Sequence, residues 1–236
     1  MDLKKEGNDI MRLSENTLNV LKNFATINQG IVVKPGKVLR TISSNKAILA
    51  EANVEESFPT EFGIYDLNKL LGVISQNKNS PEVEFEKDFL VFRSVGSIRL
   101  RYTPATLILS PPNKNINIQD YDVEFNLSQE VLQWIFNTAS ILKAPNIVIK
   151  SDGGKNGEIN VWAMDVKGEI VDDANVKVDG TSDIAFEAAL KIENLKILQG
   201  AYKVEISSQG VSKFYNADRK LTYWIAIEQA SSTFNK

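Results

Sequence analysis

One segment of this chain occurs twice, about half a chain length apart. Residues 13–21 read LSENTLNVL and residues 127–135 read LSQEVLQWI, so apolar positions match except at Thr17 and Val131. The copies lie 114 positions apart (127 − 13) in a chain of 236 residues. A repeat of this period predicts two copies of one structural unit, a construction common in symmetric assemblies.

Both copies carry the signals of a helix start. Ser14 and Ser128 are good N-cap residues, each flanked by leucines spaced as a hydrophobic staple. The pattern predicts helices over 15–27 and 128–143, with shorter ones over 66–78 and 191–197. One half of each long helix is apolar, and the other is mostly Asn, Gln, Ser and Thr. Such a face favours a hydrated surface that makes weak, sequence-independent contacts, with compositional drift as the alternative.

The remaining segments read as strands and hairpins, which predicts an α+β fold with antiparallel sheets. Turn signals lie at 35–36, 152–154, 167–168, 179–180 and 209–210. The expected strands are 30–34, 46–53, 58–64, 82–86, 89–93, 97–102, 146–150, 158–163, 183–190, 201–207, 211–215 and 221–228. Two domains, 12–109 and 121–236, are expected on either side of a Pro- and Asn-rich connector, 110–120. The polar residues 1–11 are expected to form a disordered arm.

Composition argues against catalysis. The chain has no His and no Cys, so the commonest general base, the commonest metal ligand and every thiolate site are missing. We expect no catalytic residue, no cofactor and no metal. Residues 30–37 miss the phosphate-loop pattern, and 152–158 read as a hairpin tip rather than a calcium loop. Two acid pairs, 55–56 and 172–173, read as exposed charge, and Trp134, Trp162 and Trp224 as core.

Charge is distributed unevenly between helices and sheets. The four expected helices hold six lysines, at 22, 69, 78, 143, 191 and 196, against four acids, at 15, 66, 130 and 193. They therefore carry +2, which leaves −5 for the rest of a chain whose net charge is −3. Slightly positive helices and negative sheets suit helices that face an anion.

Two blocks of residues resemble the sliding clamps of T-even-like bacteriophages. They are LNVLKNFATINQGI at 18–31 and FGIYDLNKLLGVI at 62–74, and Pro112-Asn113-Lys114 falls where that family joins its two domains. The second half is similar mainly in pattern, through the Ser128 helix and residues 200–203. The resemblance covers the chain from about Arg12 onward.

The resemblance implies the DNA clamp fold: two structurally repeated domains per chain, with helices lining the inside of a ring and antiparallel sheets outside. Two domains per chain imply a homotrimer that encircles duplex DNA without sequence specificity and tethers the phage DNA polymerase. An ATP-dependent clamp loader is implied as a partner, and phage late-transcription factors are further partners that it allows. The implied location is the cytoplasm of the infected bacterial host, with no membrane contact.

The resemblance also indicates candidate site residues. Neighbours of DNA phosphates would be Arg12, Lys22, Lys69, Lys78, Lys143, Lys191 and Lys196. A partner-peptide pocket would be lined by Leu107, Ile108, Ile116, Ile118 and Tyr121. Edge strands at 97–102 and 168–172 would join neighbouring subunits, through Ser97, Arg99, Arg101, Glu169 and Val171.

Two other functions stay open at this point. A monomeric clamp-fold protein could bind DNA by charge instead of closure, but it would need a strongly basic face. A carboxylate-based enzyme such as a glycosidase would need two acids converging in a pocket, and no spacing here indicates that.

Overall fold

The computed structural model describes residues 9–76, 82–112, 120–168 and 171–235. The chain forms two compact units, one of residues 1–44 and 51–111 and one of residues 45–50 and 112–236. Every strand pairing given below is antiparallel, as expected for the α+β class.

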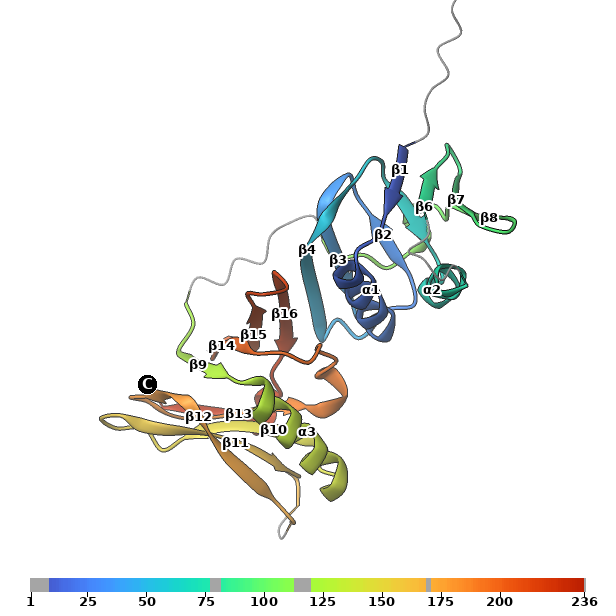
Figure 1. Cartoon of the computed structure of the whole chain (residues 1–236). Helices are drawn as coiled ribbons and strands as arrows, with labels where there is room; N and C mark the ends of the chain where they lie inside the picture. Colours follow the sequence, from blue (N-terminus) through green and yellow to red (C-terminus); the bar gives the residue numbers. More distant parts are fainter. Residues whose placement is uncertain (1–8, 77–81, 113–119, 169–170, 236) are drawn as a thin grey trace, which may run out of the picture. The chain divides into compact units, whose positions relative to one another are not determined.

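Unit 1 combines two helices with short sheets (Figure 1). Its elements are β1 (Asp9–Arg12), α1 (Glu15–Ile27), β2 (Ile31–Val33), β3 (Gly36–Ile42), β4 (Ile48–Phe58), β5 (Phe62–Ile64), α2 (Leu67–Ser75), β6 (Glu82–Phe85), β7 (Phe89–Arg93), β8 (Ser97–Arg101) and the 3-10 helix η1 (Ala105–Leu107). One sheet has the order β1-β6-β7-β8, so β8 is an edge strand, and β2 pairs with β5. The first three residues of β4 belong to unit 2.

Unit 2 is dominated by one long sheet. Its elements are β9 (Val123–Leu127), α3 (Gln129–Leu142), β10 (Asn146–Ser151), β11 (Gly157–Met164), β12 (Ala174–Ser182), β13 (Ala185–Lys191), η2 (Ile192–Asn194), β14 (Tyr202–Ser207), β15 (Val211–Asn216), β16 (Leu221–Ala226), η3 (Gln229–Ser231) and β17 (Thr233–Asn235). The strand order is β17-β13-β10-β11-β12-β9-β14-β15-β16. α3 packs on β11 and β12, which places the core between this helix and the sheet.

The two long helices begin where the repeat predicts. The hydroxyl of Ser14 accepts from the Thr17 N–H at 3.2 Å, and that of Ser128 accepts from the Val131 N–H at 3.2 Å. The side chains of Val20, Leu21 and Phe24 are buried on α1, and those of Leu132 and Ile135 on α3. The repeated motif therefore encodes the same local structure in both units.

The helix expected over 191–197 is absent: the structure has only the single 3-10 turn of η2. The backbone beyond it is held by two tyrosines instead of by helical bonds. The Tyr202 hydroxyl donates to the Leu198 carbonyl at 2.6 Å, and the Leu198 N–H donates to the Tyr223 oxygen at 3.2 Å. Burial raises the pKa of both phenols, so both stay neutral at physiological pH.

Several strand predictions are wrong. Residues 9–11, expected in a disordered arm, belong to β1, whose backbone pairs with β6. The expected strand 46–53 covers only the first part of β4, which continues to Phe58, and most of the strand found within 58–64 is the short β5. The turn expected at 179–180 lies inside β12, because Gly180 serves a close approach of strands: a Cβ there would lie 2.5 Å from the Phe125 Cβ. The strands β3, β9, β12 and β17 were not predicted.

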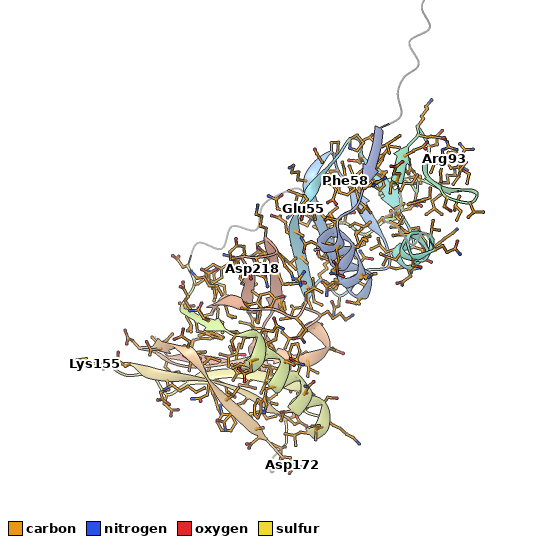
Figure 2. All side chains as sticks on the ribbon, viewed as in Figure 1. Glu55, Phe58, Arg93, Lys155, Asp172 and Asp218 are labelled. Atoms are coloured by element: carbon orange, nitrogen blue, oxygen red, sulfur yellow. The ribbon has the colours of Figure 1, made fainter. Side chains whose placement is uncertain are left out.

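Only one residue of the acid pair 55–56 is an exposed charge. Glu55 points to solvent from β4, but the Glu56 carboxylate accepts hydrogen bonds from the Ser14 N–H and the Thr17 hydroxyl (Figure 2 labels Glu55). Burial opposes ionisation of Glu56, but the bonds from Thr17 and Ser14 outweigh it and lower its pKa. A carboxylate at a helix N-terminus is also favoured by the helix dipole.

We therefore expect Glu56→Gln to destabilise unit 1 by about 1–2 kcal/mol at neutral pH, the usual value of a lost charged cap. Because the folded pKa of Glu56 is lowered, its stabilisation is present above the unfolded pKa and is lost as pH falls through the folded one. Urea unfolding from pH 7 to pH 3 should show the difference shrinking with acid. Glu55→Gln is the matched control, and equal curves for both variants would contradict this role.

Candidate functional site

Two exposed lysines of unit 1 lie on one helical layer, because α1 and α2 contact each other (Figure 1). Lys22 is exposed on α1 beside Thr26, and Lys69 is exposed on α2. Asn23, expected on the polar face of α1, is 8% exposed and belongs to the core. Lys78 lies outside the described residues.

Arg12 is exposed on β1, but it is not free to bind phosphate. Its guanidinium donates to Glu82 Oε1 from Nε at 3.2 Å and from Nη2 at 2.7 Å. Glu82 on the neighbouring strand β6 therefore neutralises the charge of Arg12. An exposed pair of this kind exchanges readily with water and other ions.

In unit 2 the exposed arc of α3 is neutral apart from one acid. It consists of Gln129, Glu130, Gln133, Asn137 and Ser140. Lys143 follows at the C-cap, in the left-handed conformation, and is exposed. Two apolar side chains border this arc: Trp134 is 43% exposed and Ile141 is 78% exposed.

The other two candidate lysines of unit 2 lie outside the α-helices that the structure describes. Lys191 is paired with Glu228 at 3.1 Å, which reduces its value as a phosphate neighbour. Lys196 is exposed just after η2. Within their observed bounds, the three α-helices hold two lysines, at 22 and 69, and two glutamates, at 15 and 130. Their net charge is zero instead of the expected +2.

The assignment of the three tryptophans to the core is wrong. Trp134 is exposed, and Trp162 and Trp224 are only half-buried. Lys150 Nζ lies 4.0 Å from the centroid of the Trp162 ring, a cation–π contact on the sheet surface. Trp134 is the most exposed of the three.

The expected interface residues are divided between the units. Ser97, Arg99 and Arg101 lie on β8, and the side of β8 away from β7 has no strand partner in the described part of the chain. Glu169 lies outside the described residues. Val171 precedes β12, and the described residues of the expected edge strand over 168–172, which are 168, 171 and 172, lie in no strand.

β12 is the strand with an open edge instead. It pairs with β11 along its length, but its other side meets β9 at a single position, Asp179 opposite Asn126. Residues 174–178 are therefore open on that side. This strand was missed because its Asp, Asn and Gly residues are typical of turns, although Val176 and Val178 alternate with polar residues as in a strand.

The expected partner pocket is only partly described. Ile116 and Ile118 lie outside the described residues. Leu107 is 67% exposed in η1, whereas Ile108 is buried against Gly63 and Gly30. Leu107 borders a hollow of about 690 Å³ that Glu61, Asp88, Arg101 and Tyr102 also line.

Tyr121, the fifth pocket residue, belongs to the surface of unit 2. Its ring centroid lies 5.4 Å from Lys213 Nζ. Burial and the neighbouring Glu205 raise the pKa of Tyr121, and Lys213 opposes them. Tyr121 thus already has a partner on its own sheet.

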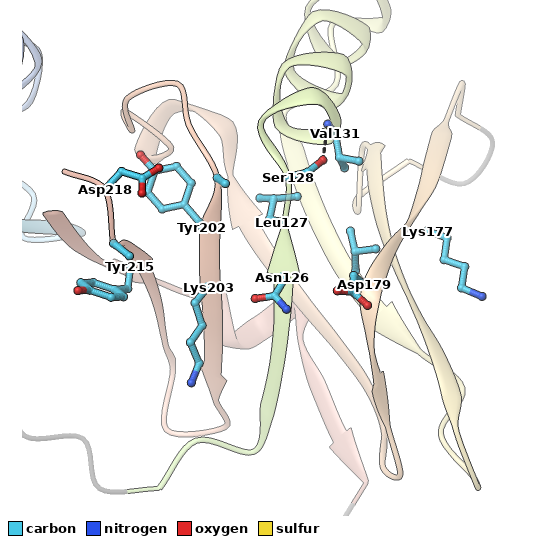
Figure 3. Close-up of a pocket in the computed structure, with 13 residues that line it drawn as sticks. Asn126, Leu127, Ser128, Val131, Lys177, Asp179, Tyr202, Lys203, Tyr215 and Asp218 are labelled. Atoms are coloured by element: carbon cyan, nitrogen blue, oxygen red, sulfur yellow. Dashed lines mark hydrogen bonds between the residues drawn. The ribbon is translucent and has the colours of Figure 1, made fainter. Parts of the chain in front are cut away.

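A groove that the sequence did not predict lies in unit 2 beside the open edge of β12 (Figure 3). Its volume is about 670 Å³. Strands β9, β12, β14 and β15 and the start of α3 line it, with Asn126, Leu127, Ser128, Val131, Lys177, Val178, Asp179, Ala201, Tyr202, Lys203, Tyr215, Ala217 and Asp218. Groups of acids that could hold a metal ion are missing among the described residues, and none of the helices described there is long and apolar enough to cross a membrane.

Comparison with known proteins gives one family. Residues 14–97 match the model of the DNA polymerase processivity factors. The sliding clamp of Vibrio phage KVP40 is 33% identical over 224 residues, which cover 92% of this chain and 99% of that protein. The sliding clamp of Escherichia phage RB69 is 28% identical over 94% of this chain and 99% of its own length.

A solved structure shares the fold. The PCNA of A. fulgidus, solved with the C-terminal region of FEN-1, superposes with a TM-score of 0.69. It is 11% identical and the match covers 93% of this chain and 97% of that one. The sequence relatives and the shared fold agree, and the chain therefore belongs to the sliding-clamp family of DNA polymerase processivity factors.

Proposed function

We propose that three copies of this chain close a ring around duplex DNA and tether the replicative polymerase of a phage. The observation that carries this proposal is the pair of open strand edges, β8 in unit 1 and residues 174–178 of β12 in unit 2. An edge strand exposes unpaired N–H and C=O groups and is stable in solution when another chain covers it. Each chain has one open edge in each unit, so copies of the chain can join head to tail and close a ring.

The adjacent surfaces support the same association. Trp134 and Ile141 are exposed on α3, which packs beneath β12. In the ring these apolar side chains would be covered by the next copy, while the neutral polar arc of α3 faces the DNA. A surface of Gln, Asn and Ser would contact the DNA through water without fixing the position of the ring.

The ring would stay on DNA because it is closed, and not because its charge attracts the DNA, since the helices as observed carry no net charge. Lys22 and Lys69 would supply the phosphate contacts of unit 1, and Lys143 and Lys196 those of unit 2. Opening and closing would need an ATP-dependent loader, and late-transcription factors are a further partner class. This role needs no catalytic residue. The protein would act in the cytoplasm of the infected bacterium.

Light scattering over a dilution series tests the assembly. We expect a species of three times 26.3 kDa, about 79 kDa. After loading by a T-even-like phage loader, the ring should remain on nicked circular DNA in high salt and leave the same DNA once it is linearised. A monomer at high micromolar concentration that dissociates equally from both DNA forms would instead indicate a monomeric accessory protein held by charge.

A further inference from the structure

The groove of unit 2 is lined mostly by apolar side chains. Leu127, Val178 and Tyr202 are buried there, and Val131 of α3 is half-buried beside them. Tyr215 also lines the groove and is 37% exposed. Ligand sites are typically concave and largely apolar, with a few polar groups that fix the orientation of the ligand. The volume of this groove, about 670 Å³, lies within the range of such sites.

One wall of the groove is held by a buried amide. The side chain of Asn216 is 2% exposed, and its Nδ2 donates to the Ala201 carbonyl at 3.0 Å. Its Oδ1 accepts from the Arg219 N–H at 2.9 Å, which fixes the turn that carries Ala217 and Asp218. A site whose walls are already in place loses little conformational entropy when a ligand binds. The groove is therefore preformed in the free chain.

The two lysines of the groove are already neutralised. Lys177 pairs with Glu158 at 2.5 Å, and Lys203 pairs with Glu124 at 2.9 Å. Figure 3 shows the Nζ atoms of both lysines directed away from Leu127. Neither lysine therefore presents a free positive charge to a ligand in the groove.

The two carboxylates of the groove, in contrast, have no ion pair among the described residues. They belong to Asp179 on β12 and Asp218 in the turn after β15, both exposed and both labelled in Figure 3. The next residue, Arg219, is half-buried, and its charge acts on the Tyr202 phenol, where burial raises the pKa and Arg219 opposes that rise. The groove thus combines two negative charges with an apolar surface.

Strand order sets the spacing of these two carboxylates. The strands β12, β9, β14 and β15 are neighbours in that order, with Asp179 on the first and Asp218 just after the last. Neighbouring strands lie about 4.8 Å apart, so three steps span about 14 Å. An extended chain covers this distance in about four residues of about 3.3 Å each. A segment that lies across the strands can therefore reach both carboxylates.

We propose that the groove binds an extended segment of a partner protein, in which two basic residues about four positions apart flank apolar side chains. The apolar side chains cover Leu127 and Val131, and the basic groups meet Asp179 and Asp218. The groove shares no lining residue with the hollow that Leu107 borders, so this surface is separate from the expected partner pocket. The proposal concerns the single chain and does not rest on the ring.

A defined peptide tests the proposal. The probe is a fluorescein-labelled peptide in which two arginines flank three leucines, and its fluorescence anisotropy is measured against the full chain. We expect one saturable site per chain. A peptide with glutamates in place of both arginines should bind about tenfold more weakly, and one with the two arginines adjacent about threefold more weakly, because it reaches only one carboxylate.

Variants of the chain locate the site. Asp179→Asn with Asp218→Asn should weaken binding of the probe about tenfold at low salt, with a smaller difference at high salt. Asp152→Asn with Asp183→Asn is the matched control, because both carboxylates are exposed in unit 2 outside the groove. Val131→Gln removes an apolar contact but places a capping-box residue three positions after the cap of α3. It should weaken binding about threefold without lowering the melting temperature.

Light scattering of the same variants separates a partner site from a contact between copies. An unchanged mass for Asp179→Asn with Asp218→Asn, together with weaker binding of the probe, supports the proposal. Dissociation of a wild-type trimer by these two substitutions would mean that another copy of the chain occupies the groove. Equal binding by both double variants, or no saturable binding up to about 1 mM probe, would also overturn the proposal.

Discussion

Replacing Ile141 by glutamate is expected to convert the trimer into monomers at micromolar concentration and to abolish retention on circular DNA. Ile141 is 78% exposed in the single chain, so the substitution should leave the fold and its melting temperature nearly unchanged. In the ring the same side chain would be covered, and an unpaired buried charge costs several kcal/mol at each of three contacts. Light scattering and sedimentation of the variant measure the loss directly.

Ser140→Glu is the matched control. It introduces the same charge one position away, on the polar arc of α3, which the proposed ring leaves in water. This variant should keep the trimer mass. A stable trimer for Ile141→Glu, or equal dissociation of both variants, would place the subunit contact elsewhere than beside α3.

The repeat explains why the helices could be predicted well and the sheets less well. Ser14 and Ser128 fix the helix starts through bonds within one turn, so their signal is local. Leu198 shows the opposite case. Its neighbours carry an apolar helical pattern, but its backbone is bound by Tyr202 and Tyr223, one of them 25 positions away. No window of sequence around 191–197 contains that information.

The candidate site was likewise predictable where it depends on local sequence signals, and not where it depends on distant residues. Lys22 and Lys69 lie on helices with clear local signals, and both are exposed as expected. Ion pairs formed by distant residues, such as Arg12 with Glu82 and Lys191 with Glu228, could not be read from spacing. The groove and the open edge of β12 arise from strand order, which depends on the whole sheet.

Reversing the two exposed charges of the unit 1 helices is the second prediction with a large effect. Lys22→Glu with Lys69→Glu changes each chain by −4, and three copies therefore change the ring by −12. Because the α-helices start from zero net charge, the inner surface would become strongly repulsive to phosphate. We expect loader-dependent retention on nicked circular DNA to fall on the order of tenfold at 0.1 M salt, with the trimer mass unchanged.

Salt separates this electrostatic effect from a failure of closure. Repulsion between the ring and DNA is screened as ionic strength rises, so retention of the double variant should recover in part at high salt, whereas a ring broken by Ile141→Glu should not recover. Lys37→Glu with Lys155→Glu carries the same charge change at exposed positions of β3 and of the β10–β11 hairpin, outside the helices, and should behave like the wild type. Unchanged retention of the helix variant at low salt would mean that α1 and α2 do not face the DNA.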